Sequence, residues 1–295
     1  MKKFFLSLLK AVLYTLLFIA VQLAVTLGLS FSIALFEELW MYITGDITYI
    51  SSLYDNLVAV VTVLSCLLTL FILWIVFSVR RKPLSREVRW HKMKQPAAAI
   101  LGPLECGFGM SILSSFVLMF LPLPDAWYAT YDESMAMMLA GDPWLLAAAT
   151  VLFAPIVEEV IFRGLVYTRL CRGMKAGIAA LISAVIFGLV HGTLLHLIYT
   201  VPMGLLLCLY YEKYRSLWAP IVFHMSFNLA GTALGYYTVD TLTVTVLLLA
   251  IGIYLTVMGF LSMYWYRDAQ GMRPARKTAE PIPVQPESET TNMEE

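Results

Sequence analysis

Residues 144–172 read WLLAAATVLFAPIVEEVIFRGLVYTRLCR, an apolar run that is long enough to cross a lipid bilayer. A membrane-spanning helix needs about 20 mostly apolar residues. The run nevertheless carries Glu158, Glu159 and Arg163 near its middle. An ionisable side chain at the bilayer centre costs about 2.5–3.5 kcal/mol on insertion scales, so such residues are rare and purposeful. The segment therefore predicts a transmembrane helix with a polar site inside it.

The rest of the chain has a similar composition. Hydrophobic residues make up 60% of its 295 residues and charged residues only 14%, whereas a soluble domain carries roughly a quarter charged residues. We therefore expect an all-α polytopic membrane protein with about eight transmembrane helices. The segments that could form them are 11–36, 57–79, 97–121, 144–172, 176–192, 194–211, 217–237 and 242–265.

Lysine and arginine are unevenly placed around these segments. With eight spans, both termini and the loops 80–96, 172–176 and 212–216 fall on one side, and these carry the basic residues. The positive-inside rule then predicts that both termini are cytoplasmic. Lys2 and Lys3 at the start of the chain, together with its general composition, indicate a multi-pass protein of a bacterial plasma membrane. The opposite loops carry only acids, namely Glu37, Glu38, Asp46, Asp55, Asp125, Asp132, Glu133, Asp142 and Asp240.

The chain divides into four parts. Residues 1–143 form an N-terminal three-helix membrane region, and residues 144–237 form a core that holds the intramembrane polar residues. Residues 238–266 contain the last transmembrane helix. The tail at 267–295 is rich in Pro, Glu and Thr, so we expect it to be disordered in the cytoplasm. The four cysteines have no paired spacing, which indicates neither a disulfide framework nor a thiolate metal site.

Helical spacing separates the two adjacent glutamates. Glu159 and Arg163 are four residues apart with the acid first, which is the favourable order for an ion pair on a helix. Adjacent residues lie about 100° apart around a helix axis, so Glu158 cannot share that face. We therefore expect Glu159 to be structural and neutralised by Arg163. Glu158 is left without a partner on its own helix.

Two further predicted helices carry polar residues. One reads Phe187-Gly-Leu-Val-His191, and the other reads His224-Met-Ser-Phe-Asn228. His224 and Asn228 are four residues apart, so one helix face presents an imidazole and a carboxamide together. A single intramembrane histidine is as compatible with a helix–helix hydrogen bond as with catalysis. His191 and His224 are therefore candidates for catalysis only when they are considered as a pair.

These three segments resemble the CAAX protease and bacteriocin-processing family, also called CPBP or Abi, of intramembrane endopeptidases, and they are similar to the type II CAAX prenyl endopeptidases. The family pattern is Glu-Glu-x-x-x-Arg, then Phe-x-x-x-His, then His-x-x-x-Asn or Asp, and the match covers roughly residues 144–237. The resemblance implies that Glu158 and His191 activate water and that His224 and Asn228 bind the oxyanion. The supporting residues would be Glu159, Arg163 and Phe187.

The resemblance favours an intramembrane endopeptidase of the glutamic type that hydrolyses a peptide bond. One alternative is a noncatalytic immunity or scaffold protein of the same fold. Another is a proton-coupled transporter, in which buried Glu and His side chains relay protons. The expected partners are the lipid bilayer and a peptide, a bacteriocin precursor or a membrane-protein segment, without nucleic acid. In a bacterial membrane, prenylated proteins are not the expected substrates, and the sequence leaves the oligomeric state open.

No cofactor is favoured, although zinc is an alternative. Glu158, His191 and His224 could supply three ligands and leave a fourth position for water, as in catalytic zinc sites. However, the chain lacks the pair of histidines four residues apart that normally binds zinc on one helix face. At that spacing His224 is paired with Asn228, a poor zinc ligand but a good hydrogen-bond donor. The spacing therefore favours a metal-free reaction.

Overall fold

The computed structural model describes residues 2–46, 48–90, 96–237 and 241–265, and every regular element in these ranges is a helix. The expected tail at 267–295 lies outside the described residues. Each of the eight segments predicted to span the membrane is helical, which confirms the all-α polytopic class. In the described ranges, six helices are long and apolar enough to cross a bilayer. The count of eight spans remains a prediction, because α10 (Ala176–Leu189) is short and α12 (Trp218–Gly235) is not among the six.

The segment that carries the two glutamates is one continuous helical rod with two wider, π-helical stretches. It runs through α7 (Pro143–Ala147), η1 (Ala148–Phe153), α8 (Ala154–Glu159), η2 (Val160–Tyr167) and α9 (Thr168–Leu170). The Asp142 side chain accepts a hydrogen bond from the Leu145 N–H and so caps its first turn. π-Helical turns are rare and are found mostly at functional sites.

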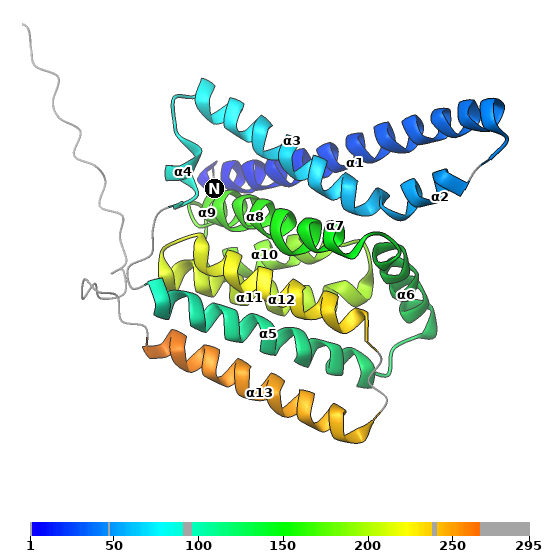
Figure 1. Cartoon of the computed structure of the whole chain (residues 1–295). Coiled ribbons are helices and arrows are strands. Elements are labelled where there is room, and N and C mark those ends of the chain that lie inside the picture. Colours follow the sequence, from blue (N-terminus) through cyan, green and yellow to red (C-terminus); the bar gives the residue numbers. More distant parts are fainter. Residues whose placement is uncertain (1, 47, 91–95, 238–240, 266–295) are drawn as a thin grey trace, which may run out of the picture.

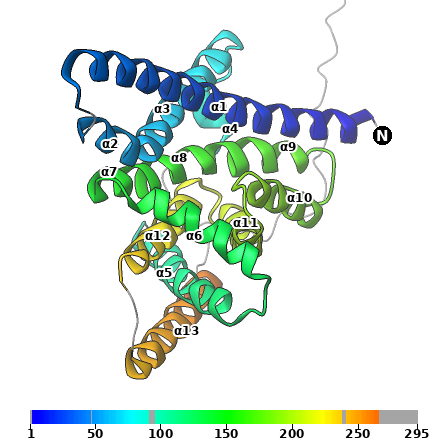
Figure 2. The same cartoon turned by 90° about the vertical axis from the view of Figure 1, so that its right-hand side faces the viewer.

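The other long helices pack around this rod in successive layers (Figure 1). On one side lie α1 (Lys2–Thr44) and α3 (Leu57–Val79). On the other side α10 and α11 (Leu194–Tyr214) form a helical hairpin beside α12. Beyond α12 follow α5 (Pro96–Phe120) and then α13 (Leu242–Trp265). Figure 2 shows the same order from the side, with α13 at the opposite edge from α1.

Small residues let α5 approach α12 closely. A Cβ atom on Gly107 would collide with the Ser226 hydroxyl and the Phe223 carbonyl of α12. Helices in lipid gain little from the hydrophobic effect between them, so close backbone packing at small residues holds them together. This contact fixes α12, the helix that carries His224 and Asn228.

Three short helices lie in segments predicted to be loops. These are α2 (Thr48–Asp55), α4 (Leu84–Glu87) and α6 (Asp125–Leu139). The α6 helix runs across the ends of the longer helices rather than along them (Figure 1). The Tyr128 hydroxyl fastens it to the end of α5 by donating to the Leu118 carbonyl at 2.8 Å.

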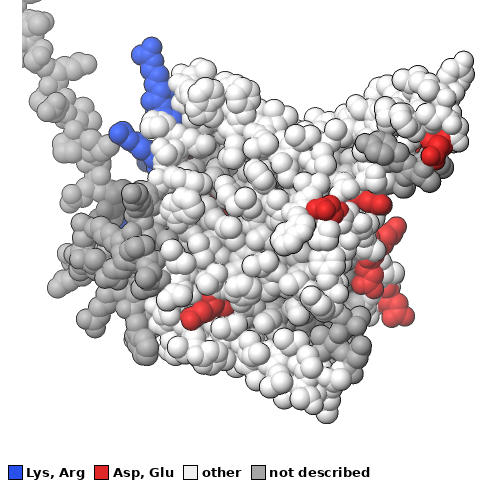
Figure 3. Space-filling view, in the orientation of Figure 1, with Lys and Arg blue, Asp and Glu red and all other residues white. Residues whose placement is uncertain are grey.

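Charge is sorted between the two ends of the bundle. In Figure 3 the visible Lys and Arg side chains gather at one end, and most visible Asp and Glu side chains gather at the other. The first described helix begins and the last one ends on the same, basic side (Figure 1). This arrangement fits an even number of membrane crossings. The assignment of the basic end to the cytoplasm rests on the positive-inside rule.

The topology can be tested by cysteine labelling. Ser85→Cys in α4 and Ala129→Cys in α6 are exposed positions at the two ends. They would be introduced after replacement of Cys171, since Cys66, Cys106 and Cys208 are buried. We expect an impermeant maleimide to label Ala129→Cys on intact cells and Ser85→Cys only after permeabilisation. Labelling of both positions from the same side would contradict the model of the membrane topology.

Candidate active site

The centre of the site is an ion pair with no solvent exposure. The Arg163 Nη1 lies 2.7 Å from the Glu159 Oε1, and both side chains are 0% exposed. The guanidinium also donates to the Gly204 carbonyl at 3.4 Å and lies 4.4 Å from the centre of the Phe187 ring. A Cβ on Gly204 would crowd α10, so glycine lets α11 bring this carbonyl close to Arg163. The ion pair predicted from the spacing is therefore confirmed.

The same carboxylate also holds a histidine. The His224 Nδ1 lies 2.9 Å from the Glu159 Oε1. A carboxylate that is ion-paired to arginine only accepts hydrogen bonds, so Nδ1 must carry the hydrogen. The other ring nitrogen, Nε2, then faces the second glutamate, with 3.6 Å to the Glu158 Oε2. Glu159 thus orients His224 as well as neutralising Arg163, a role that spacing along one helix could not reveal.

Charge balance points to a proton within this cluster. Glu158 and Glu159 bring two negative charges, whereas Arg163 brings one positive charge. A net charge is costly to keep in a membrane interior. One proton held by Glu158 or by the Nε2 of His224 makes the cluster neutral. The two groups that could hold this proton face each other at 3.6 Å, a distance longer than a hydrogen bond.

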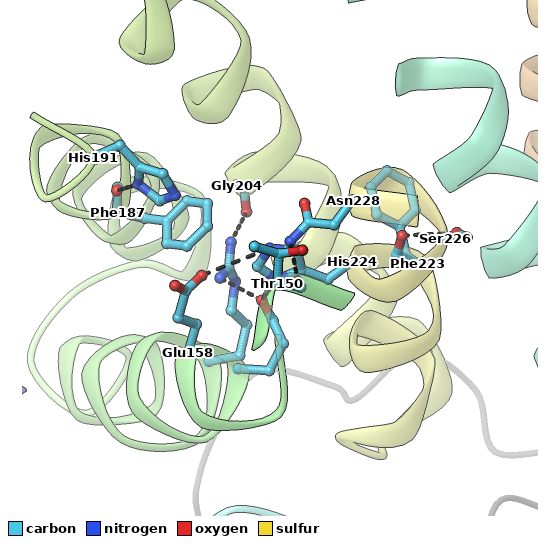
Figure 4. A network of polar contacts seen from close by, with 11 residues as sticks. Thr150, Glu158, Phe187, His191, Gly204, Phe223, His224, Ser226 and Asn228 are labelled. Atoms are coloured by element: carbon cyan, nitrogen blue, oxygen red, sulfur yellow. Dashed lines mark hydrogen bonds and ion pairs between the residues drawn. The ribbon is translucent and has the colours of Figure 1, made fainter. Parts of the chain in front are cut away.

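His191 lies in the turn two residues after the end of α10, so the predicted helix 176–192 ends before it, and it is close to Phe187. Its Nδ1 lies 2.7 Å from the Phe187 carbonyl oxygen. A backbone carbonyl only accepts, so Nδ1 is the donor and Nε2 keeps its lone pair unless the ring is protonated. The Phe187 ring contacts the rings of both His191 and His224, with centroid distances of 4.7 and 5.7 Å. Phe187 thus packs between the two imidazoles (Figure 4).

Asn228 is held by a backbone carbonyl that a proline leaves free. In an α-helix the Thr150 carbonyl would accept from the N–H of residue 154, but in η1 the Ala154 N–H bonds to the Ala149 carbonyl instead. The next residue, Pro155, has no N–H to offer. The Asn228 Nδ2 supplies the missing donor at 2.8 Å from the Thr150 oxygen. This bond fixes the direction of the amide and leaves its second N–H for another acceptor.

The sequence-predicted residues therefore come from three places in the fold. The α8–η2 rod brings Glu158, Glu159 and Arg163, α10 brings Phe187, the turn after α10 brings His191, and α12 brings His224 and Asn228. Direct contacts join most of these side chains to one another. Asn228 lies one turn beyond His224 on α12 and bonds instead to the Thr150 carbonyl of the rod. His191 contacts the cluster only through the Phe187 ring. Sequence reasoning missed Thr150 and Gly204, because both contribute backbone carbonyls rather than side chains.

The outer side of the site is covered by α6. The Tyr131 ring of this helix lies 5.0 Å from the His196 ring at the start of α11. His196 is in turn 6.0 Å from His191 and is held by the Thr193 hydroxyl. Between α10 and α11 the chain turns at Gly192, whose φ of +84° is a conformation that favours glycine. A tight turn and an aromatic cluster therefore separate His191 from the acidic end of the bundle.

The zinc alternative can be compared with these positions. Within the part of the chain that the structure describes, no group of three His, Cys, Asp or Glu side chains is close enough to hold a metal ion. The Nδ1 atoms of His191 and His224 are both engaged in hydrogen bonds, which leaves only their Nε2 atoms as ligands. Glu158, His191 and His224 are therefore too far apart to bind one zinc ion as they stand, and zinc binding would require them to move closer to one another.

Comparison with known proteins matches the stretch of chain that carries these residues. Residues 140–230 match the family model described as "Type II CAAX prenyl endopeptidase Rce1-like". A stretch of 84 residues is 36% identical to the Bacillus subtilis (strain 168) protein named "Putative membrane peptidase YdiL", covering 28% of this chain and 34% of that protein. The chain thus aligns with about a third of the length of this relative. No solved structure matches the chain. The comparisons confirm the family resemblance that the three motifs indicate.

The buried ion pair makes a prediction about stability. Glu159→Gln would leave the Arg163 charge buried without its partner, and breaking a buried pair in this way costs about 3–5 kcal/mol. We expect a large drop in the melting temperature in detergent. The double variant Glu159→Gln with Arg163→Gln should recover part of it, because no charge is then stranded.

Glu212→Gln is the matched control for this measurement. It breaks the Arg89–Glu212 ion pair, whose side chains are 29% and 38% exposed, so the expected cost is only about 0.2–1 kcal/mol. If Glu159→Gln melts at the same temperature as Glu212→Gln, the central role of the buried pair is wrong.

Proposed function

Because the membrane core is similar to the type II CAAX prenyl endopeptidases, we propose that this protein is an intramembrane endopeptidase that hydrolyses a peptide bond with water activated by Glu158. The observation that carries the proposal is the contrast between the two glutamates. Glu159 has no solvent exposure and is paired with Arg163, whereas Glu158 has 15% exposure and faces the Nε2 of His224. Glu158 is thus the carboxylate of the pair that is free to accept a proton.

Glu158 and His191 would together activate the attacking water. The Glu158 carboxylate takes one proton from the water as its oxygen attacks the carbonyl carbon, and a general base of this kind contributes about 10²–10⁴-fold. The lone pair on the His191 Nε2 accepts the second water hydrogen and so orients the oxygen. The proton on Glu158 then passes to the leaving amine nitrogen as the C–N bond breaks. The carboxylate is thereby restored for the next turnover.

The negative charge on the carbonyl oxygen would be held from α12. The Nε2 of protonated His224 can donate one hydrogen bond, while its Nδ1 stays bonded to Glu159. The second N–H of the Asn228 amide can donate another, because the first is bonded to Thr150. Such preorganised donors are often the largest single contribution to catalysis of acyl transfer. The hydrogen bonds to Glu159 and Thr150 hold both donors in place before the substrate arrives.

The substrate in this proposal is a peptide or a segment of a membrane protein that reaches the site from within the bilayer. The cluster lies in the middle of the α7–α9 rod, with 15 residues before Glu158 and 12 after it along the span Pro143–Leu170. The scissile bond would therefore have to enter the membrane interior. Comparative membrane peptidomics of cells with the wild type and with Glu158→Gln would identify peptides that depend on the site.

We expect Glu158→Gln to reduce peptide cleavage by at least about 10²-fold without changing the melting temperature. The amide has nearly the shape of the acid but cannot take the proton from water. Glu133→Gln, the same substitution on the exposed face of α6, is the matched control and should retain activity. If the Glu158→Gln protein cleaves at the wild-type rate, the proposed base is wrong; if neither wild type nor control cleaves any membrane peptide, the noncatalytic alternative is favoured.

The reaction is expected to need no metal. The residue four positions after His224 is Asn228, a side chain that binds zinc poorly, rather than a second histidine. Purified protein should hold less than stoichiometric metal by elemental analysis and should keep its activity after prolonged treatment with strong chelators. Stoichiometric zinc, with activity lost on chelation and restored by zinc, would instead identify Glu158, His191 and His224 as ligands.

A further inference from the structure

A cavity of about 360 Å³ lies at the basic end of the bundle, and none of the predicted site residues lines it. It is formed where α4 and the residues after it meet α9 and the end of α11. The charged residues that line it are Arg86, Glu87, Arg89, Arg172 and Glu212. None of these residues takes part in the candidate active site.

The lining has more positive than negative charge. One oxygen of Glu87 serves two guanidinium groups, with 2.6 Å to Arg169 and 2.7 Å to Arg172. Glu212 pairs with Arg89 at 3.0 Å. Within the described ranges, Arg86 forms no ion pair. Three arginines and two carboxylates thus line the cavity, and Arg169, which is outside the lining, shares the Glu87 carboxylate with Arg172. The lining keeps an excess of positive charge for an anion.

Arg89 is fixed in an unusual backbone conformation. Its φ of +55° lies in the left-handed region, which residues other than glycine seldom adopt. The carbonyl of Arg89 accepts from the Leu217 N–H at 3.3 Å, and its guanidinium lies 4.8 Å from the centre of the Tyr211 ring. Together with the Glu212 ion pair, these contacts hold the side chain at the wall of the cavity.

The cavity lies next to tryptophans of the kind found at the membrane surface. Trp90, adjacent to Arg89, packs against Trp218 at the start of α12 with 5.0 Å between ring centres. Tryptophan is enriched at the level of the lipid headgroups. Arginine binds phosphate oxygens with two parallel N–H groups, which makes it well suited to phosphate recognition. We propose that this cavity is a binding site for a phosphate group, supplied either by an anionic lipid headgroup or by free phosphate.

This proposal does not depend on the proposed peptidase activity. The test uses the full-length protein in neutral detergent, with two probes. In the first arm, native mass spectrometry counts bound phosphatidylglycerol against diacylglycerol, a lipid that lacks the phosphate. In the second arm, calorimetry measures the binding of inorganic phosphate. Binding that is confined to the first arm identifies a lipid headgroup as the source of the phosphate, whereas binding in the second identifies the free anion.

Arg86→Gln and Arg172→Gln are the test variants, because both side chains are on the exposed rim of the cavity. Arg80→Gln is the matched control, since it removes the same charge from the same loop but does not line the cavity. We expect each test variant to weaken binding about five-fold, with Arg80→Gln unchanged and all melting temperatures alike. Should one test variant fold poorly, the other gives the same comparison.

Three outcomes would overturn the proposal. Equal losses in Arg80→Gln and in the test variants would mean that the loop attracts anions only by its overall charge. Equal binding of the two lipids, with no binding of inorganic phosphate, would mean that the cavity does not recognise phosphate. Binding of neither phosphatidylglycerol nor inorganic phosphate would mean that the cavity is not a phosphate site.

Discussion

A guanidinium buried among membrane helices must be neutralised by groups in direct contact with it, and the other polar residues of the membrane core are positioned by this requirement. Arg163 meets it with the Glu159 carboxylate at 2.7 Å, the Gly204 carbonyl and the face of Phe187. These three groups come from different helices, so the packing of the helices must keep them within reach of Arg163. The same carboxylate then fixes His224, and His224 in turn faces Glu158. The contacts that neutralise Arg163 thereby also fix the histidine that faces Glu158.

The division between the two glutamates follows from local chain geometry. Along the α8–η2 rod, Glu159 and Arg163 share a face, so the neighbouring acid must point elsewhere. Had the sequence placed the arginine so as to pair with Glu158, the roles would be exchanged. The contrast in exposure, 0% against 15% for the two side chains, is therefore a consequence of spacing rather than of any difference in residue type.

Much of this could be predicted from the sequence, because membrane burial makes charged residues conspicuous. The helical class, the eight helical segments and the Glu159–Arg163 pair all follow from hydropathy and spacing. The helix across the acidic end, α6, could not be foreseen in the same way, because it is too polar and too short to read as a span. The full length of α1, Lys2–Thr44 against the expected 11–36, also exceeds what a bilayer needs. Contacts to backbone carbonyls, as at Thr150 and Gly204, carry no side-chain signal at the accepting position.

The bond between Asn228 and the Thr150 carbonyl has a consequence for mutational tolerance. Because the acceptor belongs to the main chain, no substitution at position 150 can delete it. The Thr150 hydroxyl itself bonds to the Leu146 carbonyl within its own helix, so its replacement leaves the acceptor intact. Any residue other than proline at position 155 would restore a competing N–H donor to the rod. This contact therefore restricts substitution of Pro155, which has no N–H, and of Asn228, which donates the bond. It does not restrict the side chain at position 150, which only contributes its carbonyl.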